Sequence, residues 1–103
     1  MNVKLEKSIL TTAIIDIDCY TELTQYPKDI FKEKIHQDLL SIISDQYSII
    51  DNLSLSHLSS LPDISNNTRI SNLLFSLVDD YEIEHDYKFI ISNMVKIYRD
   101  NLN

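Results

Sequence analysis

Two Glu-x-x-His motifs come closest, in this sequence, to a pattern that could do chemistry. Residues 33–36 and 82–85 each contain a glutamate and a histidine three positions apart, and Glu6 and Glu22 are further carboxylates. Two such motifs and two glutamates make up the ligand set of di-iron helical bundles. A site of that kind requires all of these side chains to point into the core.

The expected helical phase argues against this metal site. When Phe31 defines the buried direction, Leu39 lies on the same side, whereas Glu33 and His36 lie on the opposite face. Glu82 falls near the expected end of a helix instead of inside a bundle. We therefore predict no metal site, no cofactor and a solvent-exposed His36.

The remaining reactive side chains form no catalytic set. Cys19 lies beside Asp16 and Asp18, whose charges disfavour the reactive thiolate, so we expect a buried and inert thiol. The three histidines occupy separate segments and there is no second cysteine, so no zinc site can be assembled. His85, like His36, is expected at the surface.

The absence of glycine excludes several classes of enzyme. The chain of 103 residues contains no glycine. Glycine lets the backbone approach phosphate closely, and phosphate-binding loops, dinucleotide fingerprints and nucleophile elbows all depend on it. We therefore predict that the protein is not an enzyme.

The negative charge is concentrated in one part of the sequence. The net charge is -7, and residues 35–87 contain nine acids against the single Arg69. Residues 79–87, here named the acidic segment, contain five of these carboxylates. Concentrated negative potential attracts a basic partner, and tyrosine supplies interface area. The predicted partner-binding residues are Asp79, Asp80, Tyr81, Glu82, Glu84, Asp86 and Tyr87. The alternative interpretation is a solvated junction between helices.

Amphipathic helices are expected on both sides of the acidic segment. Apolar residues recur at helical spacing over residues 3–23, 27–44, 68–81 and 86–99, and less regularly over 47–61. Ile49 and Val78 are among the residues expected in the core. The pattern predicts an all-α fold, a compact four- or five-helix domain that takes in the whole of residues 1–103.

Local signals predict where these helices begin and end. Pro27 suits a first helical turn, Asn67 or Thr68 can cap the fourth helix, and Asp86 can cap the fifth. Residues 62–67 contain proline and two asparagines and are expected to form a loop. β-Branched residues over 11–20 leave a strand as the alternative there, although helix is favoured.

Composition also limits location and partners. No run of about 18 apolar residues is present, so we expect no membrane insertion. An acidic chain lacks the basic stripe that direct nucleic-acid binding requires. Residues 1–10 lack a signal-peptide pattern, and the lone Cys19 cannot form an internal disulfide. These features favour a cytoplasmic protein.

The acidic middle of the chain and the acidic segment resemble, in type, the small acidic helical immunity proteins of bacterial toxin systems, of the colicin or contact-dependent inhibition type. This resemblance implies an antitoxin-like protein that binds and neutralises a cognate toxin, usually a basic nuclease. A phage-encoded inhibitor or nucleic-acid mimic, whose acids replace phosphates, is one alternative. A helical adaptor module with no toxin partner is another. A compact acidic cluster flanked by tyrosines favours the immunity-type function.

Overall fold

The computed structural model describes residues 3–102. This part of the chain forms helices joined by turns and contains no strand, which confirms the all-α prediction. The helices are more numerous and shorter than the four or five expected, and none of those described is long and apolar enough to cross a membrane. In chain order they are α1 (Val3–Ile15), α2 (Ile17–Leu23), the 3-10 turn η1 (Lys28–Ile30), α3 (Lys34–Tyr47), α4 (Leu55–Ser59), α5 (Pro62–Ser65), α6 (Thr68–Asp80) and α7 (Tyr87–Asp100).

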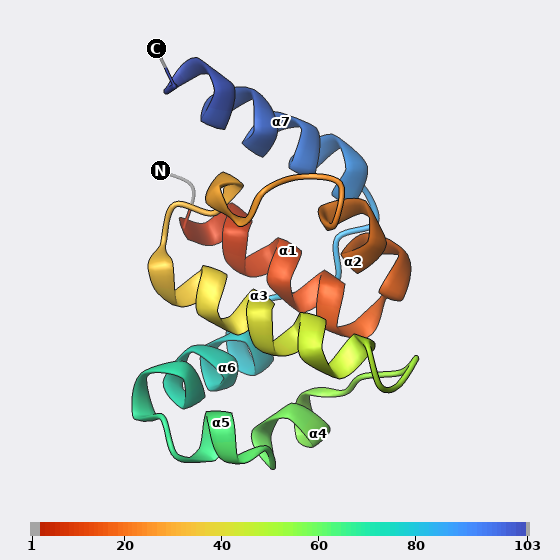
Figure 1. The fold of residues 1–103 in the computed structure, drawn as a ribbon, viewed down its shortest axis with the longest axis vertical. Helices are drawn as coiled ribbons and strands as arrows, with labels where there is room; N and C mark the ends of the chain where they lie inside the picture. Colours follow the sequence, from red (N-terminus) through yellow and green to blue (C-terminus); the bar gives the residue numbers. More distant parts are fainter. Residues whose placement is uncertain (1–2, 103) are drawn as a thin grey trace.

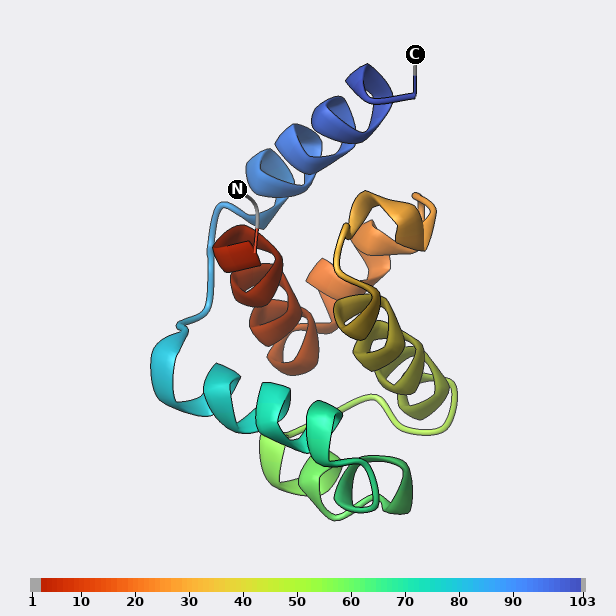
Figure 2. The same ribbon diagram turned by 90° about the vertical axis from the view of Figure 1, so that its left-hand side faces the viewer.

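Helix α1 occupies the centre of the fold. It packs against α2, α3, α6 and α7, which surround it in the two ribbon views (Figures 1 and 2). Ile9, Leu10, Ala13 and Ile14 are fully buried although they do not lie along one narrow stripe. A helix that is apolar on most of its sides is buried on most of its sides. Glu6 and three hydroxyl-bearing residues of α1 are consequently buried as well.

The single helix expected over residues 3–23 is wrong, because Asp16 divides it. Asp16 has an extended backbone, and its carboxylate accepts a hydrogen bond from the Asp18 amide at 2.9 Å. Aspartate favours this capping position over a helix interior. The resulting change of direction places Cys19 and Leu23 in the core. Both sides of the break are helical, so the strand alternative for residues 11–20 is also wrong.

The second expected helix begins later than predicted. Pro27 is followed only by the short turn η1, and regular helix starts at Lys34. Phe31 lies between these elements with an extended backbone and a fully buried ring. The residue that was expected to set the phase of this helix therefore lies outside it.

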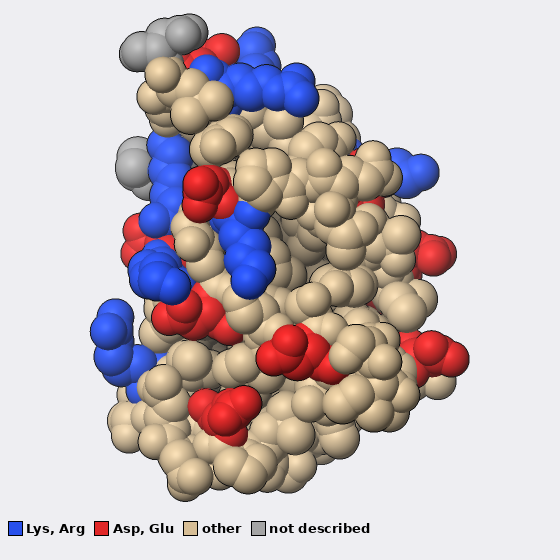
Figure 3. All heavy atoms as spheres, in the orientation of Figure 1, with Lys and Arg blue, Asp and Glu red and all other residues tan. Residues whose placement is uncertain are grey.

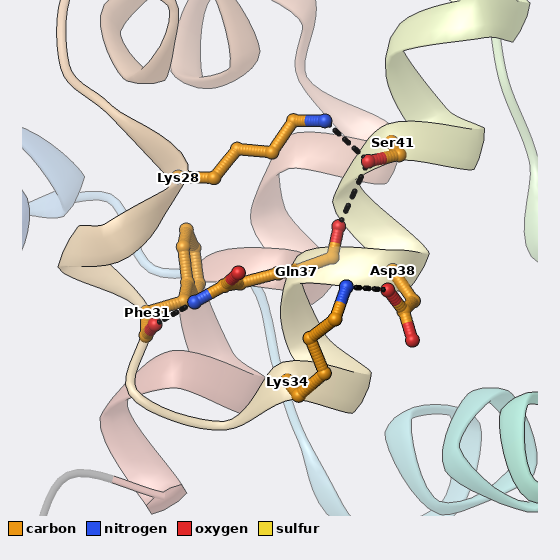
Figure 4. A network of polar contacts seen from close by, with 6 residues as sticks. All are labelled: Lys28, Phe31, Lys34, Gln37, Asp38 and Ser41. Atoms are coloured by element: carbon orange, nitrogen blue, oxygen red, sulfur yellow. Dashed lines mark hydrogen bonds and ion pairs between the residues drawn. The ribbon is translucent and has the colours of Figure 1, made fainter.

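Polar side chains connect η1 and the following loop to α3 (Figure 4). The Gln37 amide nitrogen donates to the Phe31 carbonyl at 2.6 Å, and the Lys28 ammonium group donates to the Ser41 hydroxyl. Ser41 in turn donates to the Gln37 carbonyl at 3.1 Å. These contacts hold the irregular chain against the first turns of α3.

Residues 47–61 contain much less helix than their apolar content suggested. A loop over 48–54 precedes the short helix α4. Leu53 and Leu58 are buried as expected, but Ile49 is 74% exposed, so its predicted burial is wrong. Ile49 belongs to the turn after α3, where no other element covers it.

The loop expected over residues 62–67 is also wrong in its first part. Pro62 is the first residue of the short helix α5, where its missing N–H group needs no partner. Asn66 and Asn67 then form the turn before α6. The Asn67 side chain accepts the Ile70 amide at 3.2 Å, which confirms the predicted cap.

Helices α6 and α7 bury the apolar faces predicted for them, with one correction. Leu73, Leu74 and Leu77 of α6 are buried, but Val78 is 51% exposed because it lies at the edge of that stripe. Helix α7 follows Asp86 as expected, although the Asp86 carboxylate makes no capping hydrogen bond.

Truncation of the buried faces tests this packing. We expect Leu74→Ala and Ile91→Ala each to lower the free energy of unfolding by about 2–5 kcal/mol, because both side chains are buried. Urea denaturation followed by circular dichroism measures the change. The exposed Ile49→Ala is the control and should stay within about 0.5 kcal/mol of the wild type. Losses below about 1 kcal/mol at both core positions would contradict the assigned packing.

Candidate functional site

The acidic segment joins α6 to α7. Asp79 and Asp80 are the last residues of α6, residues 81–84 have no regular secondary structure, and Tyr87 begins α7. In Figure 2 this connection runs beside α1 on its way to α7. The predicted binding residues therefore belong to two helix ends and the chain between them.

Two contacts attach the acidic segment to α1. The buried Thr12 hydroxyl accepts a hydrogen bond from the Glu84 amide at 2.8 Å while it donates to the Ser8 carbonyl at 2.9 Å. The Lys7 ammonium nitrogen lies 5.5 Å from the centre of the Tyr81 ring, within the range of a cation–π contact. Because Thr12 is fully buried, water cannot donate a hydrogen bond to its hydroxyl oxygen, and the Glu84 amide does so instead.

Most of the acids in the segment face solvent. Asp79, Asp80, Glu82 and Asp86 are exposed, whereas Glu84, Tyr81 and Tyr87 are partly buried. Within residues 3–102, the only lysine or arginine in an ion pair is Lys34, whose Nζ lies 2.7 Å from Asp38 Oδ1 (Figure 4). The Glu6–His36 contact involves no acid of the acidic segment. The carboxylates of the acidic segment are therefore not neutralised by an ion pair within the described part of the chain.

The end of α6 is electrostatically unfavourable. Its last turn contains no basic residue and instead contains Asp79 and Asp80. The C-terminus of a helix carries partial negative charge, and each acid there costs about 0.3–1 kcal/mol. Tyr81 occupies the C-cap position with an extended backbone, and its amide makes no capping hydrogen bond. Negative charge therefore accumulates at this point without a compensating cap.

Helix α2 extends the negative surface towards α7. Partial burial, followed by the charges of Asp16 and Asp18, raises the pKa of the Tyr87 hydroxyl. Asp16 caps α2 and Asp18 lies in its first turn, and α2 is in contact with α7. The side of the molecule around Tyr87 thus combines acids from two separate parts of the sequence.

The opposite side of α1 has a mixed charge distribution. Figure 3 shows lysine and arginine gathered at the top and left of that face, with acidic side chains standing apart on its lower half. The acidic segment passes behind α1 in this orientation (Figure 1). The face drawn in Figure 3 thus carries charges of both signs.

The structure reveals a buried Glu6–His36 pair that the sequence analysis missed. The prediction of an exposed His36 is wrong, since His36 is 2% exposed and Glu6 is 1% exposed. Glu6 Oε1 lies 2.6 Å from His36 Nδ1. Glu6 also accepts the Lys32 amide at 2.9 Å and the Glu33 amide at 3.4 Å. One carboxylate thus receives three donors at the start of α3.

This error has a definite physical cause. The helical phase was set by Phe31, which lies outside α3. When Leu39 and Ile43 define the buried direction, His36 lies about 60° from Leu39 and on the buried side. The apolar residues on several sides of α1 were the available signal that Glu6 is buried too.

The Glu6–His36 pair fits a structural role. The carboxylate places negative charge at the N-terminus of α3, where the helix dipole favours it. The exposed Glu33 occupies the N-cap position but makes no side-chain capping hydrogen bond. The Glu6 carboxylate instead accepts hydrogen bonds from backbone amides at this end of the helix. Glu33 is exposed as predicted, so the 33–36 motif does not present both side chains to one site.

The remaining potentially reactive side chains form no reactive site within residues 3–102. Cys19 is fully buried, and burial, followed by the charges of Asp16 and Glu22, raises its pKa to about 12. The thiol is therefore protonated at neutral pH and inaccessible, as expected. Across residues 3–102, no three histidine, cysteine or acidic side chains are grouped so that they could hold a metal ion.

Comparisons with protein-family models, curated proteins and solved structures found no match to this chain.

Removal of the Glu6 carboxylate tests its role in stability. We expect Glu6→Ala to lower the free energy of unfolding by about 3–5 kcal/mol, because it leaves buried donors unpaired. The double variant Glu6→Leu/His36→Leu should lose less than the sum of the two single leucine variants, because it removes both partners. Urea denaturation of the three leucine variants measures this coupling. Strict additivity, or a loss below about 1 kcal/mol for Glu6→Ala, would contradict the assignment.

Proposed function

We propose that this protein is a non-catalytic, immunity-type inhibitor that binds a basic protein through the acidic segment. The cognate partner is a bacterial toxin, with a basic nuclease as the class that fits best. The contact residues are Asp79, Asp80, Tyr81, Glu82, Glu84, Asp86 and Tyr87. Binding takes place in the cytoplasm of the producing cell and needs no cofactor.

The unfavourable end of α6 is the observation that supports this proposal most. Asp79 and Asp80 reduce the stability of their own helix, because they add negative charge to its negative end. A lysine or arginine from a partner would relieve this repulsion on binding. A nuclease must present positive potential to nucleic acid, so it supplies such cations at the surface that an inhibitor has to cover.

The attachment to α1 supports the same function. The Thr12–Glu84 hydrogen bond fixes the irregular part of the acidic segment before any partner binds. A surface that is already ordered loses less conformational entropy on binding. The two partly buried tyrosines, Tyr81 and Tyr87, lie in this surface and offer aromatic contact area beside the acids.

Neutralisation of the exposed acids tests the proposal. The partner is first captured from the source organism on the immobilised protein and identified. The test variant is Asp79→Asn/Asp80→Asn/Glu82→Gln. We expect its association rate to fall by about tenfold or more at low salt, because long-range attraction is lost. The difference should shrink at high salt, where the Debye length shortens. Surface-immobilised binding kinetics at two salt concentrations measure both effects.

A matched control separates local charge from net charge. Asp29→Asn/Glu33→Gln/Asp100→Asn removes the same charge from three exposed positions elsewhere. It should change the association rate much less than the test variant. Equal effects of the two triple variants would show that the association rate depends on net charge and not on the acidic segment. Unchanged kinetics in the test variant would show that the acidic segment is only a solvated junction.

A further inference from the structure

A groove between α4 and α6 exposes apolar surface next to the acidic segment. Its volume is about 400 Å³, and it is lined by Leu55, Ser56, Ser59, Leu74, Phe75 and Val78. Phe75 is 57% exposed and Val78 is 51% exposed. Large apolar side chains grouped in a groove are typical of a protein-binding surface.

The groove is next to strongly negative surface. Phe75 and Asp79 are four residues apart on α6 and therefore lie on the same side of the helix. No lysine or arginine lines the groove, and its α6 wall ends at Asp79 and Asp80. An occupant that buries apolar side chains here places its neighbouring polar residues against these acids. Charge complementarity therefore requires lysine or arginine at that end of the occupant.

The walls of the groove also indicate the shape of the occupant. Both walls are helices. Phe75 and Val78 form a short ridge at the i, i+3 spacing, and ridges of this spacing fit the grooves on the surface of another helix. Binding of an amphipathic helix in an apolar groove uses this arrangement, with apolar anchors on one face.

We propose that the α4–α6 groove binds a basic amphipathic helix of the partner protein. Apolar side chains of that helix pack on the exposed Phe75 and Val78, and its cations meet Asp79 and Asp80. This inference rests on the proposed function and specifies which part of the partner is bound. It adds an apolar contact, which limits dissociation, to the charges that accelerate association.

A designed peptide tests the proposal directly. The probe is a short Lys–Leu amphipathic helical peptide with one tryptophan on its apolar face. The protein contains no tryptophan, so selectively excited emission reports the peptide alone. We expect saturable binding with a blue shift of the emission. A Lys–Gln peptide of equal charge should bind at least about tenfold more weakly, because it has no apolar face.

Two protein variants separate the apolar contact from the charges. Phe75→Ser/Val78→Ser should weaken binding of the Lys–Leu peptide about tenfold or more. Ile49→Ser/Phe89→Ser, which changes two exposed apolar residues outside the groove, should bind as the wild type does. Asp79→Asn/Asp80→Asn should weaken binding mainly at low salt. Thermal unfolding and circular dichroism check that each variant is folded.

Three results would overturn this assignment. Wild-type affinity in Phe75→Ser/Val78→Ser excludes the groove, and the proposed function still stands if the native partner depends on the acids. Salt-independent wild-type affinity in Asp79→Asn/Asp80→Asn excludes a basic occupant and counts against the proposed function too. A concentration-dependent dimer that the groove variant abolishes would assign the groove to a second copy of this chain.

Discussion

The burial of polar side chains on α1 determines where several other parts of the fold are placed. Glu6 and Thr12 lie on a helix that is covered on most of its sides, where water cannot satisfy them. The Glu6 carboxylate therefore needs donors from a distant part of the chain, and the Thr12 hydroxyl, which donates to the Ser8 carbonyl within α1, can still accept one hydrogen bond. Glu6 finds its donors at the start of α3, and Thr12 finds its donor in the Glu84 amide. The same requirement thus positions α3 and the acidic segment against one central helix.

This arrangement connects the core to the surface. The acids after α6 are attached at Glu84 to the most buried helix of the protein, while their own side chains face solvent. Attachment keeps like charges close together although they repel one another. Repulsion at the end of α6 lowers stability slightly, and it also creates a surface that a basic partner stabilises. The exposed apolar ridge of α6 gives such a partner a second, non-ionic contact.

Periodicity in the sequence was enough to predict the class of fold and its more regular helices. The apolar stripes of α6 and α7 and the Asn67 cap depend on neighbouring residues, so they can be derived from local patterns. The break at Asp16 could not, because the apolar pattern continues across it. The Glu6–His36 pair joins residues thirty positions apart, and no local pattern carries that information. The density of acids in residues 79–87 is evident from the sequence. The hydrogen bond from the Glu84 amide to Thr12 could not be predicted, because it joins residues that are distant in the sequence.

Contact with α1 orders the acidic segment, and hydrogen exchange of the Glu84 amide tests this order at the residue that makes the contact. In the described chain, the Ile83 and His85 amides have no hydrogen-bond acceptor, whereas the Glu84 amide donates to Thr12. Exchange measured by NMR on the wild type and on Thr12→Val compares these three neighbours. We expect a slow Glu84 amide between two fast ones in the wild type, and three fast amides in Thr12→Val. A Glu84 amide that exchanges as fast as Ile83 in the wild type would contradict this expectation.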